Sequence, residues 1–595
     1  MLKKKRILLF PVIIAVFLMT GNLLYGKESR EKIYLQTDRG AYIAGEHLFY
    51  KINLIHADEF AAGAADEIAY VILRNHHNTV ISSIMVRLVE GKAWGDIYLP
   101  DTLSTGLYQM VAFTHVMRNL DKEFFCPKEI VIVNRFDKQI VSLWQHSLAE
   151  NHIRTKDTIF ISPWKYFKKE EYNKQMLLVR TSKKEYGNRE MIQAEIIYMP
   201  VDGDSLVSLS VSVAEELSFL SDYKIQQDGE RINKDITSGY ATSHDIPFSE
   251  FLPERSGVIL RGIVRKENHE PARGVYVLLS VPDSVVNLDY AITDTSGVFR
   301  FLLNDYYENK RLILSVRGSL DPGKYKIEIE NKYLVPFPFR PVPVSFPKGF
   351  KNHLLRSQDI VRIQKIYQTD WIRREERRYK KNYYPPVIYS EPSSVIIPND
   401  YVPLNDLMEI AKELSPYLRI RKKGEEYVVR IFNTPADLFF NVNPAIFLDG
   451  VLVKEISPLI PLDSKQIKKI ELVQATWFHG NIRFPGILAV FSGNNAIDHY
   501  PFGSGELITH MGSFEKPSSY HPPRYDVESS EKMTIPDFRQ LLYWQPDITL
   551  KQSGKKEISF YSGDLSSSYI IEVTGVTLKG KKIVAYSRFD VKQKK

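Results

Sequence analysis

Short runs in which apolar and polar residues alternate recur along most of this chain, and turn residues separate them. A period of two places every second side chain on one face, as in a β-strand with one buried side. Aromatic residues make up 12% of the chain, and Tyr and Phe favour such half-buried pleated surfaces. The sequence therefore predicts a mostly β fold, with tandem β-sandwich domains and one small α+β domain. The clearest runs are residues 47–54, 106–114, 191–198, 207–214, 258–264 and 298–303.

Changes in composition divide the chain further. A length of 595 residues accommodates about three to six domains. Irregular polar, Pro-rich and Gly/Ser-rich stretches mark the boundaries, and a charged stretch with an apolar face predicts a solvated helix. The predicted segments are β-sandwiches at 27–140, 158–222 and 257–332, a charged helix at 358–382, an α+β domain at 403–493, a loop at 494–530 and a C-terminal β-sandwich at 531–595.

The first 26 residues have the pattern of a secretory signal peptide. Residues 3–6 are basic, residues 7–19 are largely apolar, and Gly21 and Asn22 break the run. The apolar stretch is short for a membrane span. We expect cleavage after Gly26 and export, and an uncleaved N-terminal anchor is the alternative. Because no Cys follows the apolar run, a lipid anchor is not expected.

Charge and cysteine content narrow the classes of partner. The formal net charge is +8, but beyond the N-terminus the basic residues are spread along the chain. This distribution does not provide a nucleic-acid-binding surface. The single cysteine, Cys126, excludes an internal disulfide and a multi-cysteine metal site. We expect no cofactor and no bound metal.

One element near the N-terminus carries a family resemblance. Tyr42, Gly45 and Glu46 form a Tyr-x-x-Gly-Glu pattern just ahead of an aromatic strand. This pattern resembles the macroglobulin-like β-sandwich domain of alpha-2-macroglobulins. The resemblance implies that Gly45 turns the chain, that Tyr42 packs over the core, and that Gly106 and Tyr108 belong to the last hairpin of the same domain.

Two further stretches are similar to the same family. Residues 183–196 and 206–213 resemble a second, weaker copy, and residues 537–546, which include Trp544, resemble the segment that leads into later sandwich domains of macroglobulins. The reactive thioester of that family needs a Gly-Cys-Gly-Glu-Gln element. Cys126 lacks those neighbours, so covalent trapping of proteases is not implied.

Residues 257–316 resemble a second module. Gly262, Gly274, Asp294 and Gly297 fall where the carboxypeptidase regulatory-like domain places them. That module has a transthyretin-like β-sandwich fold and no catalytic residues of its own. The resemblance therefore implies a fold and does not imply peptidase activity.

Residues 444–492 resemble the plug domain of TonB-dependent outer-membrane receptors. Asp449 and Gly450 would form a hairpin turn after a buried strand, Glu471 would lie in a later strand, and Gly486 would turn the chain into the last strand. A plug normally sits inside a barrel of ~22 strands, each of ~9–11 residues. The segment after Ser492 resembles a soluble sandwich instead, so we expect a plug-like domain without a barrel in this chain.

Catalytic patterns are scarce. His56 and Glu59 have the His-x-x-Glu spacing of a zinc site, but they follow a sandwich strand and border an Ala/Gly-rich loop, so we interpret them as loop residues. His76 and His77 fall in an expected hairpin turn. Asp449 and Glu471 could form a carboxylate pair, although their positions in the plug resemblance explain both as turn and strand residues.

The predicted function is that of a non-catalytic binding or scaffold protein, located in the periplasm or at the outer membrane of a Gram-negative bacterium. Its predicted partners are envelope proteins, with a TonB-dependent transporter as a candidate, and it would have peripheral or no membrane contact. Two alternatives stay open. One is a non-covalent protease inhibitor of macroglobulin type, and the other is a hydrolase whose site is assembled from distant residues.

Overall fold

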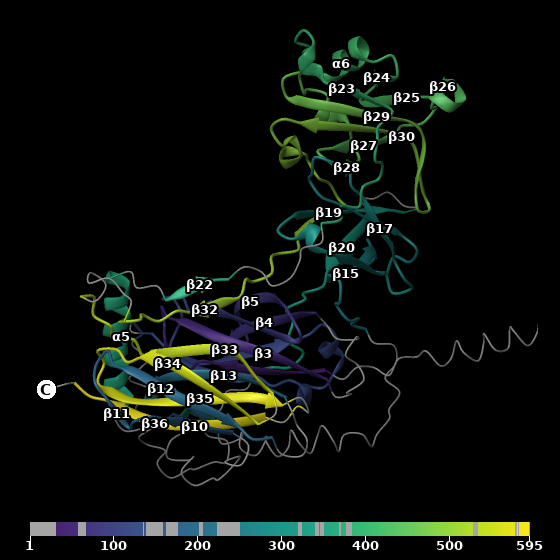
Figure 1. Ribbon diagram of the computed structural model, residues 1–595. Coiled ribbons are helices and arrows are strands. Elements are labelled where there is room, and N and C mark those ends of the chain that lie inside the picture. Colours follow the sequence, from purple (N-terminus) through teal and green to yellow (C-terminus); the bar gives the residue numbers. More distant parts are fainter. Residues whose placement is uncertain are drawn as a thin grey trace, which may run out of the picture. The chain divides into compact units, whose positions relative to one another are not determined.

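The computed structural model describes residues 31–56, 67–134, 136–137, 159–161, 177–200, 206–222, 250–318, 324–339, 344–345, 350–367, 371–375, 383–526, 534–551, 553–577, 580 and 582–593 (Figure 1). The expected signal peptide at 1–26 lies outside them. The chain forms two compact units. Unit 1 comprises Met1–Arg255, Val335–Arg377 and Glu515–Lys595, and unit 2 comprises Ser256–Leu334 and Arg378–Phe514. Each unit therefore combines segments that are far apart in the sequence.

The first β-sandwich lies in unit 1 and consists of a three-stranded and a five-stranded sheet. The sheets have the orders β1-β3-β6 and β2-β8-β7-β4-β5. Ile33, Tyr70 and Phe113 are among the side chains that the sandwich buries completely. The alternation that predicted strands thus separates a core face from an outer face. The strands are β1 (Glu31–Thr37), β2 (Ala41–Ile43), β3 (His47–His56), β4 (Ile68–Asn75), β5 (Val80–Arg87), β6 (Lys92–Tyr98), β7 (Gly106–Phe113) and β8 (Lys128–Val133).

The second β-sandwich of unit 1 is discontinuous in sequence. Its sheets have the orders β10-β12-β34 and β11-β36-β35-β13-β33, and in Figure 1 the yellow C-terminal strands lie among the blue ones. One core of buried residues, which includes Ile196, Val211 and Phe560, joins them. The strands are β10 (Leu177–Thr181), β11 (Glu185–Tyr186), β12 (Met191–Tyr198), β13 (Leu206–Glu215), β33 (Leu541–Lys551), β34 (Gly554–Tyr561), β35 (Ser567–Thr577) and β36 (Lys582–Val591).

This arrangement corrects the prediction of separate sandwiches at 158–222 and 531–595. Strand β12 pairs with β34, and β13 lies between β33 and β35. Each segment supplies only part of each sheet, so neither segment alone could cover both faces of a core. The local pattern identified the strands but not their partners.

The two sandwiches of unit 1 share one strand topology. The order β1-β3-β6 corresponds to β10-β12-β34, and β2-β8-β7-β4-β5 corresponds to β11-β36-β35-β13-β33. In both sandwiches the short second strand pairs in parallel with the last one. A short hairpin joins β4 to β5, whereas residues 216–540 separate β13 from β33. The second sandwich is therefore a copy of the first with a long insertion between its fourth and fifth strands.

Unit 2 begins with a third β-sandwich, whose sheets have the orders β18-β15-β20 and β17-β16-β19-β31. The prediction of a loop over 494–530 is wrong at 518–520, where Ser518–Tyr520 forms a strand, and at 506–510, because β31 pairs with β19. That strand is only five residues long and has polar residues at both ends, so its alternation is weak. The strands are β15 (Val258–Lys266), β16 (Tyr276–Ser280), β17 (Asp289–Ile292), β18 (Val298–Leu303), β19 (Arg311–Arg317), β20 (Tyr325–Ile329) and β31 (Glu506–His510).

The α+β part of unit 2 contains a five-stranded sheet in the order β23-β29-β30-β27-β28 and a smaller sheet, β24-β25-β26. Helix α6 (Leu407–Leu414) begins after Asp406, whose carboxylate accepts a hydrogen bond from the Glu409 backbone N–H at 2.7 Å. Leu407 and Ile410 bury the apolar face of this helix in the core. The strands are β23 (Ser394–Ile396), β24 (Leu418–Lys423), β25 (Glu426–Asn433), β26 (Leu438–Phe439), β27 (Ala445–Leu448), β28 (Val451–Val453), β29 (Ile467–His479) and β30 (Ile482–Ser492).

The remaining elements belong to unit 1. Helix α5 (Phe350–Ile366) packs Leu354 and Val361 against β2 and β8. The sequence predicts this charged helix at 358–382, but it begins eight residues earlier, at Phe350, and ends at Ile366. The end of the predicted range contains a strand instead, β22 (Ile372–Arg374), which pairs with β32 (Ser518–Tyr520). A small sheet joins β14 (Leu220–Asp222), β9 (Ile159–Ile161) and β21 (Val344–Ser345).

The fold is mostly β, which confirms the predicted fold class. Neither α5 nor any other helix in the described part of the chain combines the length and apolar character needed to cross a bilayer.

The shared sandwich makes a testable prediction. A chain that ends at residue 533 lacks β33–β36, so Val207 and Val211 would lose the strands that cover them. We expect residues 177–222 to become sensitive to protease and the far-ultraviolet circular dichroism of β-structure to fall. A chain that ends at Gln593 keeps every described strand and serves as the control. Undiminished protease resistance of residues 177–222 in the shorter chain would contradict the shared sandwich.

Candidate functional site

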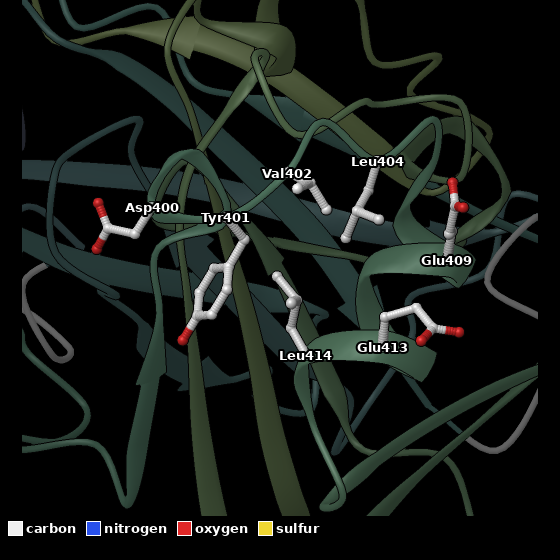
Figure 2. A pocket seen from close by; sticks show the side chains of 7 residues that line it. All are labelled: Asp400, Tyr401, Val402, Leu404, Glu409, Glu413 and Leu414. Atoms are coloured by element: carbon white, nitrogen blue, oxygen red, sulfur yellow. The ribbon is translucent and has the colours of Figure 1, made fainter.

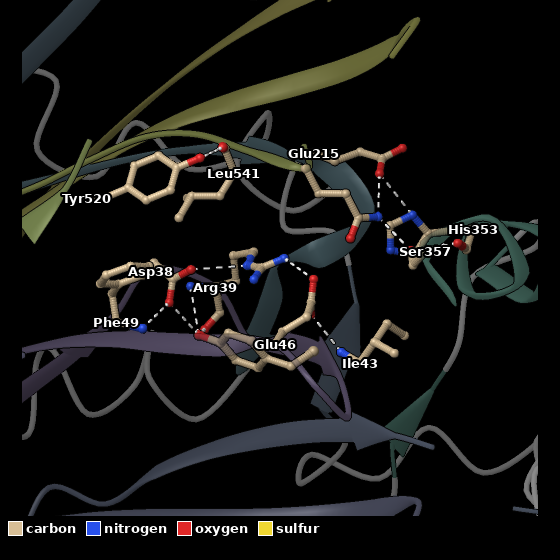
Figure 3. A network of polar contacts seen from close by, with 12 residues as sticks. Asp38, Arg39, Ile43, Glu46, Phe49, Glu215, His353, Ser357, Tyr520 and Leu541 are labelled. Carbon is tan, nitrogen blue, oxygen red and sulfur yellow. Dashed lines mark hydrogen bonds and ion pairs between the residues drawn. The ribbon is translucent and has the colours of Figure 1, made fainter. Parts of the chain in front are cut away.

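The motif residues at the N-terminus form a buried polar network between β1 and β3 (Figure 3). Asp38 Oδ1 accepts hydrogen bonds from the Tyr42 hydroxyl at 2.7 Å and from the Phe49 backbone N–H at 2.9 Å. Arg39 pairs with Asp38 at 3.0 Å and with Glu46 at 3.4 Å. Burial raises the pKa of the Asp38 carboxyl, and Arg39 opposes that shift. These groups bond to one another, so the network stabilises the turn and leaves few hydrogen-bond donors or acceptors for a ligand.

Gly45 closes this turn. Its φ angle of +102° lies in the left-handed region, and its N–H donates to the Leu99 carbonyl at 2.7 Å. A Cβ at Gly45 would lie 2.3 Å from Asp101 Oδ1. The Glu46 carboxylate accepts from the Ile43 backbone N–H at 2.7 Å. Gly45 therefore lies in a turn that a larger residue would strain, and Tyr42 is buried.

The second sandwich repeats this network at identical spacing. The Tyr186 hydroxyl accepts from the Lys183 N–H at 2.9 Å, as the Tyr42 hydroxyl does from the Arg39 N–H at 3.1 Å. Glu190 accepts from the Gly187 N–H at 2.7 Å and pairs with Lys183 at 2.7 Å. Arg189 occupies the left-handed position of Gly45, with a φ of +54°.

The last hairpins match in the same way. The Tyr108 hydroxyl donates to the Ser104 carbonyl at 2.7 Å, four residues back. The Tyr569 hydroxyl donates to the Leu565 carbonyl at 3.2 Å, also four residues back. Tyr108 is the third residue of β7 and Tyr569 is the third residue of β35, and Gly106 starts β7. Sequence reasoning found Tyr108 but missed Tyr569, whose signal was this repeated spacing.

A polar seam joins the two sandwiches of unit 1. Lys51 on β3 is completely buried, and its ammonium donates to Ser208 Oγ at 2.8 Å and to the Leu209 carbonyl at 3.0 Å. Gln36 on β1 donates to Thr574 Oγ1 at 2.8 Å and accepts from Ser210 Oγ at 2.9 Å. Burial lowers the pKa of Lys51 to about 7. The seam therefore contains a lysine whose charge is costly at neutral pH.

Apolar side chains continue the seam. Phe49, Trp544 and Ile570 belong to one buried cluster that spans both sandwiches. Trp544, selected from the sequence, lies on β33 and is thus a packing residue of this contact.

A second polar cluster, which we name the Glu215 clasp, lies where the chain leaves and re-enters the second sandwich (Figure 3). Glu215 ends β13, and its carboxylate pairs with His353 at 3.1 Å and with Arg356, both on α5. Gln540, just before β33, donates to Glu215 at 2.9 Å and to Ser357 Oγ of α5 at 2.5 Å. Burial raises the pKa of Glu215, but the hydrogen bond and charge of His353 and the charge of Arg356 bring it down to about 2.

The residues of the regulatory-like resemblance lie in the third sandwich and serve its backbone. Asp294 Oδ1 accepts from the backbone N–H groups of Ser296 and Val298, and Gly297 follows with a φ of +74°. Gly274 also has a positive φ and closes a turn. Gly262 lies within β15, where a Cβ would come within 2.5 Å of the Phe299 ring.

The residues of the plug resemblance lie in the α+β part. Asp449 and Gly450 form the turn between β27 and β28, and both have positive φ angles. The Asp449 carboxylate accepts from Ser492 and Ile497, whereas Glu471 accepts from the Tyr389 hydroxyl at 2.7 Å. The two carboxylates are bound by different residues, so the structure supplies no sign of a paired acid–base site. Gly486, with a φ of +84°, lies inside β30 where its register with β29 shifts, and not ahead of the last strand as the resemblance implied.

The histidines selected from the sequence do not assemble a site within the described residues. His56 ends β3, and Glu59 lies outside the described residues. His76 and His77 are exposed in the hairpin between β4 and β5, with ring centroids 3.9 Å apart. Over the same described ranges, no group of three or more His, Cys, Asp or Glu side chains is placed to hold a metal ion.

The α+β part also carries an open hollow of about 780 Å³ that sequence reasoning missed (Figure 2). Its apolar centre comes from the segment before α6 and from the end of that helix, and acidic residues flank it (Figure 2). No local spacing marks these residues, because the chain turn between β23 and α6 brings them together. The lining residues are Asp400, Tyr401, Val402, Leu404, Glu409, Glu413 and Leu414.

No protein-family model matches the chain, and no curated protein matches it. Solved structures similar to it include trypsin-activated alpha-2-macroglobulin from Escherichia coli, with 8% identity over 94% of this chain and 41% of that one, at a TM-score of 0.22. Salmonella alpha-2-macroglobulin reacted with methylamine matches with 9% identity over 95% of this chain and 39% of that one, at a TM-score of 0.23. The chain spans about two fifths of the length of these proteins. TM-scores this low establish neither a shared architecture nor a shared activity.

The Glu215 clasp generates a prediction with a defined pH range. Because the pKa of Glu215 falls from 4.5 to about 2 on folding, its ion pairs stabilise fully above about pH 4.5 and are lost as the pH falls towards 2. We expect Glu215→Gln to lower the free energy of unfolding of unit 1 by about 3 kcal/mol at neutral pH, and the loss to shrink over that range. Urea unfolding followed by tryptophan fluorescence measures it.

The matched control is Glu195→Gln, which removes an exposed ion pair with Lys555. Its cost should stay below about 1 kcal/mol. Equal costs for the two variants, or a cost of Glu215→Gln that does not change with pH, would contradict a buried clasp.

Lys51 generates a prediction of opposite sign. Below about pH 7 the buried Lys51 ammonium is charged and destabilises the fold. Between about pH 7 and 10.5, Lys51 is neutral in the folded protein but still protonated in the unfolded chain, so the unfolded chain binds more protons. The free energy of unfolding of the natural protein should therefore rise relative to that of Lys51→Met over this interval, by up to about 5 kcal/mol. Lys555→Met, at an exposed site, should leave the pH profile unchanged. Parallel profiles for the natural protein and Lys51→Met would refute the assignment.

Proposed function

We propose that this chain is an exported, non-catalytic binding scaffold of a Gram-negative cell envelope. The observation that carries the proposal is the repeated sandwich of unit 1, in which the same topology and the same polar motif occur twice. The motif side chains form bonds within each turn and the seam residues form bonds between the sandwiches. Such residues stabilise a rigid scaffold, and scaffolds of this kind position the loops that carry binding residues.

The location and partner are finer parts of the proposal. The signal-like residues 1–26 support export, and the plug resemblance of residues 444–492 supports a TonB-dependent transporter as partner. The macroglobulin resemblance supports a second candidate, a non-covalent protease inhibitor. The similar structures include Escherichia coli alpha-2-macroglobulin activated by trypsin and by porcine elastase.

Affinity capture with the full chain, using envelope fractions of the source bacterium, tests the binding function. We expect a TonB-dependent transporter to be enriched over the level captured by an unrelated exported β-sandwich protein with the same tag. Recovery of no membrane protein above that level would contradict the proposal.

Incubation with proteases tests the second candidate, the non-covalent protease inhibitor. An inhibitor of this type would reduce protease cleavage of large substrates more than cleavage of small ones.

A further inference from the structure

The hollow beside α6 exposes apolar side chains that a water-facing surface does not require. Val402 is 73% exposed and Tyr401 is 57% exposed. Together with Leu404 and Leu414 they form the centre of the hollow, as Figure 2 shows. Exposed apolar groups that line a concave surface are typical of a site that a partner covers.

Carboxylates flank this apolar centre. Asp400 lies on one side of it, and Glu409 and Glu413 lie on the other (Figure 2). The lining residues include no Lys or Arg, although the chain as a whole has a net charge of +8. The local sign is therefore opposite to that of the chain, which favours a cationic occupant.

These carboxylates keep acceptor capacity for a partner. Glu409 Oε2 accepts from the Asn405 backbone and side chain at 2.7 and 2.9 Å, which leaves its other oxygen available. Glu413 pairs with Lys412, but both side chains are largely exposed and such surface pairs are weak.

We propose that the hollow binds a peptide segment of a partner protein in which one apolar side chain stands between two basic residues. The apolar side chain would pack between Tyr401, Val402 and Leu414, and the basic residues would reach the carboxylates on either side. A divalent cation fits less well, because the described acidic residues form no metal-binding group. This inference rests on the proposed binding function and deepens it by naming the chemistry of a partner.

Fluorescence anisotropy with the full chain tests the site. The probes are the labelled peptides Gly-Lys-Leu-Lys-Gly, Gly-Lys-Ser-Lys-Gly and Gly-Glu-Leu-Glu-Gly. We expect saturable binding of the first peptide, weaker at high salt, and much weaker binding of the other two. The double variant Asp400→Asn/Glu413→Gln should weaken binding at least about fivefold, and Val402→Ser should also weaken it. Glu409 is left unchanged because it contacts the start of α6.

The matched control is Glu425→Gln, which neutralises an exposed carboxylate in the turn between β24 and β25, outside the hollow. It should bind the first peptide like the natural protein. The proposal is overturned if the first peptide does not bind saturably, if the Ser peptide binds equally well, or if the double variant and the control behave alike. Capture of a transporter by a chain that does not bind the peptide would overturn this site alone, whereas failure of the capture experiment would overturn the proposed function.

Discussion

The pairing of β13 with two strands from the far end of the sequence is the interaction on which unit 1 depends. Strand β13 forms antiparallel ladders with both β33 and β35, and without them its buried Val207, Val211 and Val213 would face water. Closing so long a loop costs conformational entropy, which the shared apolar core must offset. The Glu215 clasp lies where the insertion begins and ends, and it connects α5 to the ends of β13 and β33. Glu215, His353 and Arg356, the ionisable residues of the clasp, therefore stabilise the junction between the second sandwich and α5.

The repeated sandwich explains the role of many buried polar groups in unit 1. Each copy fixes its first turn with a tyrosine, a basic residue and a glutamate at the same spacing, and each fixes its last hairpin with a tyrosine hydroxyl on a carbonyl four residues back. Burying a polar group without a hydrogen bond is costly, and the partners of these motif and seam residues come from within the turn or across the seam. The surfaces that remain for recognition lie elsewhere, and the hollow beside α6 is one of them.

Local pattern predicted strands well and partners poorly. The runs at 191–198 and 298–303 coincide with β12 and β18, because alternation reports burial of one face directly. The clearest runs do not include β2, because three residues show no period, and the predicted loop at 494–530 includes β31, because that strand is short and polar at its ends. Nothing local encodes that β12 pairs with β34 or that Asp400 and Glu413 line one hollow, since both depend on segments that meet only after folding. The sequence predicts the motif residues Tyr42, Gly45 and Tyr108 and a second, weaker copy at residues 183–196 and 206–213, but only the strand order shows that β33–β36 complete this copy.

Native-state hydrogen exchange measured by mass spectrometry tests the central claim most directly. The claim is that the segments before and after the insertion at 216–540 form one sandwich. Amides in a single cooperative unit open together and share one free energy of opening. The account predicts that Leu206–Glu215, Leu541–Lys551 and Ser567–Thr577 lose protection together as denaturant increases, while Ile467–His479 and Ile482–Ser492 of unit 2 follow a separate course. Loss of protection in Leu206–Glu215 at a denaturant concentration where Leu541–Lys551 and Ser567–Thr577 remain protected would contradict it.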